Sequence, residues 1–240
     1  FGNFQLATIT GKIFEDQNQN GLLDSNESNT LSNIPIELKQ GGNAVDTILT
    51  SNNGTYSFVG LSAGEFFVHP IISDDWQVTF PKSGSFTIVL NSGEHSIEND
   101  FGLFGFGKVS GTIFHDKNAN GILNDNDSSL VQWKVYLTNL CGDVNCAVDS
   151  MLTSDDGKYS FLHLNAGSYR IVEQIPSLWF VSLPESNYYN LTVVSRTSST
   201  GKNFGNYRKG LVQGLTIYDR NANGVLDSNE VVLQEWKIRL

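Results

Sequence analysis

Apolar and polar residues alternate along most of the chain, with the two-residue spacing of strands that bury one face. No stretch of about a dozen residues carries an apolar stripe at helical spacing. The pattern therefore predicts an all-β protein. The clearest alternating sets are Ile34, Ile36 and Leu38, then Phe86, Ile88 and Leu90, then Trp133, Val135 and Leu137, and finally Trp236, Ile238 and Leu240.

Two dipeptides predict tight turns within this pattern. Asn53-Gly54 precedes the alternating pair Tyr56 and Phe58, and 156–157 (Asp-Gly) precedes Tyr159 and Phe161 in the same way. Asn-Gly and Asp-Gly are typical of two-residue β-hairpins, because these residues tolerate positive φ. We therefore expect a hairpin at each dipeptide.

The alternation is organised into repeats. A similar segment of strand followed by Asp-x-Asn-x-Asn-Gly begins at Ile9, Val109 and Val212. The copies are spaced by roughly 100 residues, the usual size of a small β-sandwich domain. The first two copies continue to match downstream, where 49–58 aligns with 152–161, 63–68 with 166–171, and 99–102 with 202–205.

These matches predict the domain organisation. About seven short strands per repeat, bounded by glycine and asparagine turns, favour tandem immunoglobulin-like Greek-key β-sandwich modules. We expect the following segments: 1–7, the tail of a preceding module or a linker; 8–103, β-sandwich repeat 1; 108–206, β-sandwich repeat 2; 211–240, a partial repeat 3 with its first strands and loop.

The loop after the first strand of each repeat carries candidate metal-binding chemistry. In repeat 1 its oxygen-bearing residues have the ligand spacing of an EF-hand calcium loop, including one backbone carbonyl and a closing glutamate. The hard Ca²⁺ ion takes about six to eight oxygen ligands, and a glycine permits the sharp turn between them. The predicted ligands of repeat 1 are Asp16, Asn18, Asn20, the Leu22 carbonyl, Asp24 and Glu27.

The other repeats carry the same loop, with Asn124 and Asp127 of repeat 2 in place of the aspartate and the closing glutamate. The predicted ligands of repeat 3 are Asp219, Asn221, Asn223, the Val225 carbonyl, Asp227 and Glu230. Those of repeat 2 are Asp116, Asn118, Asn120, the Ile122 carbonyl, Asn124 and Asp127. Aspartate is one methylene shorter than glutamate, so we expect repeat 2 to bind calcium most weakly.

Asn-Gly sequences also form plain turns, which would explain a single copy of this loop. Three copies with an oxygen ligand at every expected position favour Ca²⁺ binding instead. A helix-loop-helix is excluded because the residues before each loop, such as 10–14, have the character of a strand. We therefore predict EF-hand-like calcium loops on a β-sandwich.

Charge and composition narrow the function. The chain has 15 basic and 25 acidic residues, so nucleic acid and anionic membranes are poor partners. Membrane insertion is not expected, since no run approaches the ~20 apolar residues of a spanning helix. The sequence has no nucleophile elbow, no phosphate-binding glycine loop and no paired carboxylates outside the metal loops. We expect a secreted or cell-surface protein that is not an enzyme.

Two further features suit an extracellular location. Cys141 and Cys146 are close in sequence, and a disulfide that clips a loop is the first interpretation, with free thiols as the alternative. Among the Asn-x-Ser/Thr triplets, those at Asn190 and Asn53 are candidate glycosylation acceptors. The triplets at Asn26 and Asn126 lie in the metal loops.

The loop, the Gly-x-Tyr-x-Phe segments and the Asp/Asn-Phe-Gly that closes each repeat resemble a known family. They are similar to the B-type repeats of serine-aspartate-rich bacterial surface adhesins, the SdrD B-like family of prealbumin-like sandwiches. The resemblance covers nearly the whole chain. It implies rigid, Ca²⁺-dependent stalk modules strung in series, and a metal-ligand role for Asp16, Asp116, Asp219 and their loop partners.

Two hypotheses of function follow. The first is an extracellular structural array, a Ca²⁺-stiffened stalk or fibril component, whose partners are neighbouring modules of the same protein. The alternative is an adhesin that binds a protein or glycan through an exposed sandwich face. In repeat 3 the predicted strand 236–240 would leave an apolar edge open. Other copies could cover that edge by strand complementation in a filament.

Overall fold

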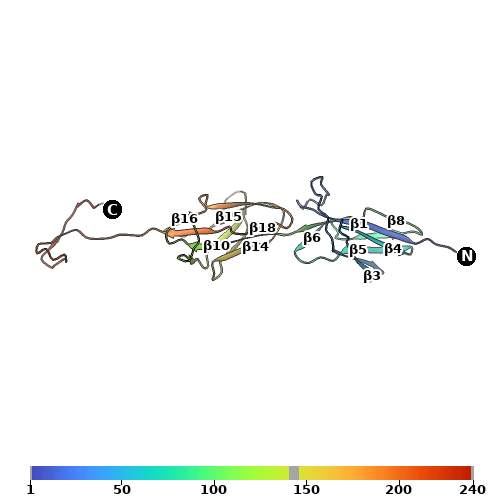
Figure 1. Ribbon diagram of the computed structural model, residues 1–240, viewed down its shortest axis with the longest axis horizontal. Coiled ribbons are helices and arrows are strands. Elements are labelled where there is room, and N and C mark those ends of the chain that lie inside the picture. Colours follow the sequence, from blue (N-terminus) through green and yellow to red (C-terminus); the bar gives the residue numbers. More distant parts are fainter. Residues whose placement is uncertain (1, 141–145, 239–240) are drawn as a thin grey trace. The chain divides into compact units, whose positions relative to one another are not determined.

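The computed structural model describes residues 2–140 and 146–238 (Figure 1). Its regular elements are β-strands arranged in stacked sheets, which confirms the predicted all-β sandwich fold. The chain divides into two compact units, of which the first ends at Tyr207 and the second begins at Arg208. Among the described residues, none belongs to a helix with the length and apolar character needed to cross a bilayer.

Repeat 1 is a sandwich of two sheets. One sheet has the strand order β4-β1-β9-β6, with β8 beside β1, and the other has the order β3-β2-β5-β7. The strands are β1 (Ala7–Glu15), β2 (Pro35–Gln40), β3 (Asn43–Leu49), β4 (Thr55–Leu61), β5 (Gly64–Pro70), β6 (Trp76–Phe80), β7 (Phe86–Leu90), β8 (His95–Ser96) and β9 (Phe101–Gly105).

Repeat 2 has the same arrangement. One sheet has the order β11-β10-β19-β16, with β14 and β18 also paired to β10, and the other has the order β13-β12-β15-β17. The strands are β10 (Gly107–His115), β11 (Ser128–Ser129), β12 (Lys134–Asn139), β13 (Ala147–Leu152), β14 (Lys158–Leu164), β15 (Gly167–Glu173), β16 (Trp179–Leu183), β17 (Tyr188–Val193), β18 (Ser198–Ser199) and β19 (Phe204–Arg208).

The strand registers of the two repeats also agree. The first strand pairs parallel to the last, with Ile13 opposite Phe101 in repeat 1 and Ile113 opposite Phe204 in repeat 2. In both repeats the antiparallel pairing of the first strand with β4 or β14 has a register shift near its start. The first strand is therefore the centre of its sheet, and the loop that follows it starts from the middle of the sandwich.

Each repeat has its own apolar core between its sheets. The alternating residues of the sequence pattern fill both cores, and Ile36, Leu38, Val135 and Leu137 are at most 1% exposed. Strand β9 serves both repeats, because Leu103 packs in the first core and the next residue, Phe104, packs in the second. Successive strand side chains point to opposite faces, which makes this sharing possible.

The turns at Gly54 and Gly157 form, but they do not make hairpins, so that prediction is wrong. The Gly54 N–H donates to the Ser51 carbonyl at 2.8 Å, yet β3 and β4 belong to different sheets. Gly54 lies against β1 instead, where a Cβ would be 2.7 Å from the Ile13 carbonyl oxygen. The turn therefore carries the chain from one sheet to the other.

The second unit holds a short sheet of β20 (Ile217–Tyr218) and β21 (Val231–Val232) around the third loop. The predicted strand beginning at Trp236 is not formed, since 236–238 lie outside any strand. Trp236 is 65% exposed and Ile238 is 71% exposed. A strand needs a neighbour to pair with, and within the described residues of this unit 236–238 have none. Leu240 lies outside the described residues.

Candidate metal centres

The first loop begins where β1 ends, at the fully buried Asp16. The Asp16 N–H donates to the Leu103 carbonyl of β9 at 3.0 Å, which anchors the residue to the sheet. Its carboxylate accepts the N–H of Asn20 at 3.2 Å and that of Gly21 at 2.7 Å. Asp16 thus organises the turn from inside, as the first residue of a cation loop does.

The side-chain ends of three predicted ligands converge in this loop. The amide nitrogens of Asn18 and Asn20 each lie 2.8 Å from Asp24 Oδ2. The Asn18 Oδ1 atom also accepts the Asn20 N–H at 3.1 Å. The two asparagine amides therefore meet at the Asp24 carboxylate, which brings three of the predicted ligand residues together in the loop.

Glu27, at the closing position, returns to the start of the loop. One carboxylate oxygen accepts the Gln17 N–H at 2.7 Å and the other accepts the Asp24 N–H at 3.1 Å. The side chain is almost fully buried. Gly21 has a φ of +77°, and a Cβ there would be 3.0 Å from the Thr79 carbonyl oxygen, so the turn needs glycine.

The third loop repeats this network in the second unit. Asp219 accepts the N–H of Asn223 and of Gly224, and this backbone hydrogen bonding lowers the pKa of Asp219. The amide nitrogens of Asn221 and Asn223 again lie 2.8 Å from Asp227 Oδ2. The Glu230 carboxylate accepts the backbone N–H groups of 220 and 227. The described residues of this unit, 208–238, form no sandwich around the loop, so its geometry is set locally.

The second loop keeps the buried aspartate at its start but differs at the position of Asp24. Asp116 accepts the Asn120 N–H at 3.1 Å and the Gly121 N–H at 2.6 Å, and Asp127 closes the loop through the N–H groups of 117 and 124. Burial acts to raise the pKa of Asp116, but the Ser182 hydroxyl and the loop N–H groups outweigh it and lower the pKa.

Asn124 stands where the other two loops have Asp24 or Asp227, the aspartate to which the asparagine amides donate. Its amide nitrogen donates to the Ile122 carbonyl at 3.0 Å, which occupies a predicted ligand oxygen. As in the first loop, the side-chain oxygens of Asn118 and Asn120 accept the backbone N–H groups two residues further on. The predicted ligands of the second loop therefore include one carboxylate fewer than those of the first loop, and that carboxylate is the one to which the amides of the first loop donate.

The donor set suits a hard cation. The predicted ligands are carboxylate, amide and carbonyl oxygens, which Ca²⁺ prefers over nitrogen or sulfur. Within the described ranges, no cluster of three or more His, Cys, Asp or Glu side chains has metal-holding geometry. Any cation site in these loops therefore depends on asparagine and backbone oxygens as well as on carboxylates.

The remaining predicted sites are the two candidate glycosylation acceptors and the cysteine pair. Asn190 is exposed on β17, and its Oδ1 accepts the Arg170 Nε–H at 3.0 Å. Asn53 is exposed in its turn, where it accepts hydrogen bonds from Ser51 and Thr55. Glycosylation of either asparagine stays a prediction. Cys141 lies outside the described residues, and the disulfide between Cys141 and Cys146 also stays a prediction.

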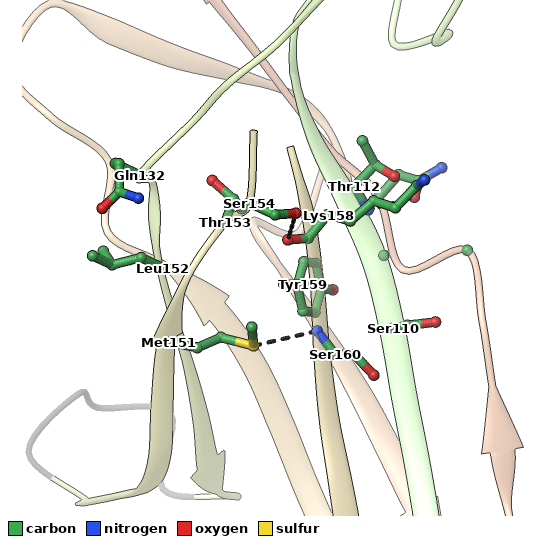
Figure 2. Close-up of a pocket in the computed structure, with 13 residues that line it drawn as sticks. Ser110, Thr112, Gln132, Met151, Leu152, Thr153, Ser154, Lys158, Tyr159 and Ser160 are labelled. Atoms are coloured by element: carbon green, nitrogen blue, oxygen red, sulfur yellow. Dashed lines mark hydrogen bonds between the residues drawn. The ribbon is translucent and has the colours of Figure 1, made fainter. Parts of the chain in front are cut away.

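A groove between the edges of the two sheets was not predicted from the sequence (Figure 2). In repeat 2 it has a volume of about 620 Å³, with Met151 from β13 facing Ser160 from β14, and Leu152 also lines it. The Ser160 N–H donates to the Met151 sulfur at 3.2 Å across it. A groove of about 770 Å³ lies in the same position in repeat 1, between Leu49 and Ser57.

Repeat 2 also contains a buried polar cluster that repeat 1 lacks. The Asn206 amide donates to Glu173 Oε2 at 2.8 Å. Glu173 Oε1, Asn206 Oδ1 and Trp133 Nε1 are buried without a hydrogen-bond partner in the described part of the chain. Burial raises the pKa of Glu173 to about 7, although Asn206 and Trp133 act in the opposite direction.

The corresponding positions in repeat 1 hold Ile34, Pro70 and Leu103. Polar residues at positions that are apolar in the other copy were therefore a signal for this cluster in the sequence.

Fold and family match together define the chain as a tandem array of β-sandwich modules. The family model of the SdrD B-like domain matches residues 7–99 and 107–207, and the chain belongs to this family.

Two curated relatives are similar to nearly the whole of this chain. Serine-aspartate repeat-containing protein F of Staphylococcus epidermidis is 24% identical over 253 residues, covering 95% of this chain and 15% of the relative. Serine-aspartate repeat-containing protein D of Staphylococcus aureus is 27% identical over 241 residues, covering 91% of this chain and 18% of the relative. The chain thus spans less than a fifth of the length of these relatives.

Solved structures with some similarity include the Bacillus anthracis TIE protein, at a TM-score of 0.38 and 14% identity over 96% of this chain and 42% of that one. The minor pilin GBS52 of Streptococcus agalactiae has a TM-score of 0.34 and 12% identity over 88% of this chain and 98% of that one.

Proposed function

We propose that this chain is part of a structural array, a stalk or fibril component at the cell surface, whose repeats are stiffened by Ca²⁺. One observation carries the proposal: the same oxygen-rich loop, with the spacing of a calcium loop, follows the first strand of every repeat. In repeats 1 and 2 the first residue of the loop, Asp16 or Asp116, is fully buried at the centre of its sheet. A cation there would tie the loop to the core.

The residues that would hold the ion in repeats 1 and 3 are the aspartates, asparagines and closing glutamate of each loop. Asp16 and Asp219 stay fixed by loop N–H groups, and the closing carboxylates of Glu27 and Glu230 face back to the loop start. Ca²⁺ supplies charge neutralisation where two or more carboxylates lie close together. The loops contribute pre-shaped backbone, so little ordering remains to be done on binding.

The energetic consequence follows from linkage. An ion that binds only the folded loop stabilises it by RT ln(1 + [Ca²⁺]/Kd), or about 2.7 kcal/mol at a hundred times Kd. A typical domain is stable by only about 5–15 kcal/mol. Each occupied loop would therefore supply a large share of the stability of its repeat, which suits a module that carries mechanical load.

Thermal unfolding of the whole chain in millimolar Ca²⁺ and in excess chelator tests the proposal. We expect a large rise of the midpoint with Ca²⁺, little effect of Mg²⁺, and loss of most of the rise in Asp16→Ala plus Asp116→Ala. Asp74→Ala removes an exposed acid outside the loops and is the matched control. Identical melts with and without Ca²⁺ would show that the loops are plain turns, and the proposal would be abandoned.

The partners in this function are the neighbouring repeats of the same chain. Exposed Trp236 and Ile238 add a second partner, another copy that supplies a strand to this segment. Sedimentation at increasing concentration tests the second partner. Trp236→Ser plus Ile238→Ser should abolish any association, and a wild-type chain that stays monomeric at high concentration argues against complementation.

The second candidate function is adhesion through an exposed sandwich face. The groove between the sheet edges favours it, because the groove lies in the same place in both repeats and is bordered by exposed Leu49 and Leu152. Binding of extracellular-matrix proteins and a glycan array to the whole chain tests it. Binding that is lost in Leu49→Asp plus Leu152→Asp would support adhesion, and no binding to either set would favour the purely structural role.

A further inference from the structure

Repeats 1 and 2 meet through a turn of repeat 2, residues 194–197, which contacts the ends of β1 and β9. The Gly105 N–H donates to the Ser195 hydroxyl at 3.0 Å, and the Arg196 N–H donates to the Gly105 carbonyl at 2.7 Å. The Ser195 N–H donates to the carbonyl of Gln17, inside the first loop, at 3.0 Å. A single residue, Phe106, separates β9 from β10. The junction is thus closely packed on both sides of the connection.

Arg196 adds a paired charge to this backbone contact. Its Nε donates to Glu15 Oε1 at 2.7 Å and its Nη2 to Glu15 Oε2 at 2.5 Å. Glu15 is only 2% exposed, whereas Arg196 is 54% exposed. The Arg196 guanidinium also lies 5.8 Å from the centre of the Trp76 ring. A buried carboxylate requires such a partner, and the planar guanidinium matches its two oxygens.

Gln19, within the first loop, makes a second contact with repeat 2. Its side-chain oxygen accepts the Ala166 N–H at 2.9 Å. Its side-chain nitrogen lies 2.9 Å from Asn165 Oδ1 and 2.7 Å from Gln77 Oε1 of its own repeat. The end of repeat 1 that faces repeat 2 therefore carries a specific set of polar side chains.

Comparison of the repeats separates the general part of the junction from the specific part. In repeat 1 the Gly93 N–H donates to the Gln5 carbonyl at 2.9 Å, as Arg196 does to Gly105. The backbone contact is therefore common to both repeats. The side chains are not, because Gly93 stands where repeat 2 has Arg196. In repeat 2, His115 and 119 (Ala) stand at the positions of Glu15 and Gln19.

We propose that Glu15 and Arg196 form a specificity clasp between repeats. The end of repeat 1 that carries Glu15 accepts a SdrD B-like repeat whose turn corresponding to 194–197 contains an arginine. The ion pair then holds the two repeats as one rigid body. The end of repeat 2, with His115 in place of Glu15, does not accept an arginine turn in this way. The repeats are then not interchangeable, and the side chains at each junction fix their order.

Residual dipolar couplings of the intact, isotopically labelled chain test the clasp. We expect one alignment tensor to describe repeats 1 and 2 of the wild type. In Arg196→Gln, which changes a half-exposed side chain, we expect two tensors of different magnitude. Lys158→Gln removes an exposed ion pair within repeat 2 and is the matched control. Separate tensors in the wild type, or one shared tensor in Arg196→Gln, would overturn the proposal.

The charge exchange Glu15→Arg plus Arg196→Glu sharpens the test. In the double variant the alignment tensors of repeats 1 and 2 should differ less than they do in Glu15→Arg alone. An equal difference in the double and the single variant would count against a specific Glu15–Arg196 pair. Because Glu15 is buried and its variants risk misfolding, the decision rests on Arg196→Gln. The measurements are made both in Ca²⁺ and in chelator. Failure of the clasp is then distinct from failure of calcium binding, which the thermal melts report separately.

Discussion

Repeats 1 and 2 have the same framework and different polar interiors. In both, a tyrosine after the Gly54- or Gly157-type turn donates its hydroxyl hydrogen to a carbonyl of the closing segment, Tyr56 to Asn99 and Tyr159 to Lys202. The polar cluster around Glu173 exists only in repeat 2. The difference shows that glycines and aromatic residues fix the sandwich, while other positions are free to acquire chemistry particular to one repeat.

The common framework is closely packed at one glycine of the first strand. A Cβ on Gly11 would collide with the carbonyl of Asn99, and one on Gly111 with the carbonyl of Lys202. In both cases the obstacle is backbone, which cannot move aside as the end of a side chain can. The tyrosine hydroxyl bonds to the same carbonyl, so the glycine and the tyrosine together hold the closing segment in place.

The largest expected effect tests this shared framework. Gly111→Ala should destabilise repeat 2 by about 4 kcal/mol or more, because overpacking against backbone belongs to the severe class of substitutions. Gly11→Ala should cost repeat 1 a similar amount. Hydrogen exchange of each core measures the change repeat by repeat. Gly210→Ala, where a Cβ would meet nothing within 4 Å, is the control and should change neither core.

The next-largest expected effect is a pH dependence of stability that Glu173 gives to repeat 2 and that repeat 1 lacks. The pKa of Glu173 is raised from 4.5 to about 7, so the folded chain keeps a proton that the unfolded chain loses. The contribution of Glu173 to the stability of repeat 2 is therefore greatest below about pH 4.5, and it falls by about 3 kcal/mol as pH rises to about 7. Glu173→Gln should flatten the fall and make repeat 2 more stable at pH 8.

Hydrogen exchange of the β15 amides across this pH range measures the fall. The other titratable groups beside Glu173 are Tyr159 and Tyr189, whose pKa values are raised above the ordinary phenol value, mainly by burial. They do not titrate in this window. Glu185→Gln, at an exposed position, should leave the profile unchanged. An unchanged profile in Glu173→Gln would show that the cluster is not the source of the pH dependence.

The smallest expected effect compares the two loops. Asn124→Asp gives repeat 2 the carboxylate of repeat 1, and Asp24→Asn makes the reverse change. If calcium binds both loops, each exchange should move the affinity of its own loop by about tenfold, or about 1.4 kcal/mol, in opposite directions. Calorimetric titration of the intact chain measures both. If both exchanges changed the calcium affinity in the same direction, the residue at position 24 or 124 would not set the difference in affinity between the two loops.

Much of the fold followed from the sequence alone, whereas calcium binding by the three loops stays a prediction. Strand alternation placed the core residues of both repeats, because each strand buries one face and the period is local. The side-chain hydrogen bonds of the predicted ligands in the first loop are local as well, since they join residues at most ten apart, as from Gln17 to Glu27. The third loop shows this directly, because it forms the network of the first around Asp219 without a sandwich in its unit.

Only the tertiary structure decided which distant segments meet. The Asn53-Gly54 dipeptide has the local chemistry of a hairpin, but packing of Gly54 against β1 sends the next strand to the other sheet. Burial of Glu173, and with it a raised pKa, depends on how two sheets close around it. Glu15 and Arg196 are 181 residues apart. A local pattern carries no information about such a pair, because the contact exists only after both sandwiches have formed and docked.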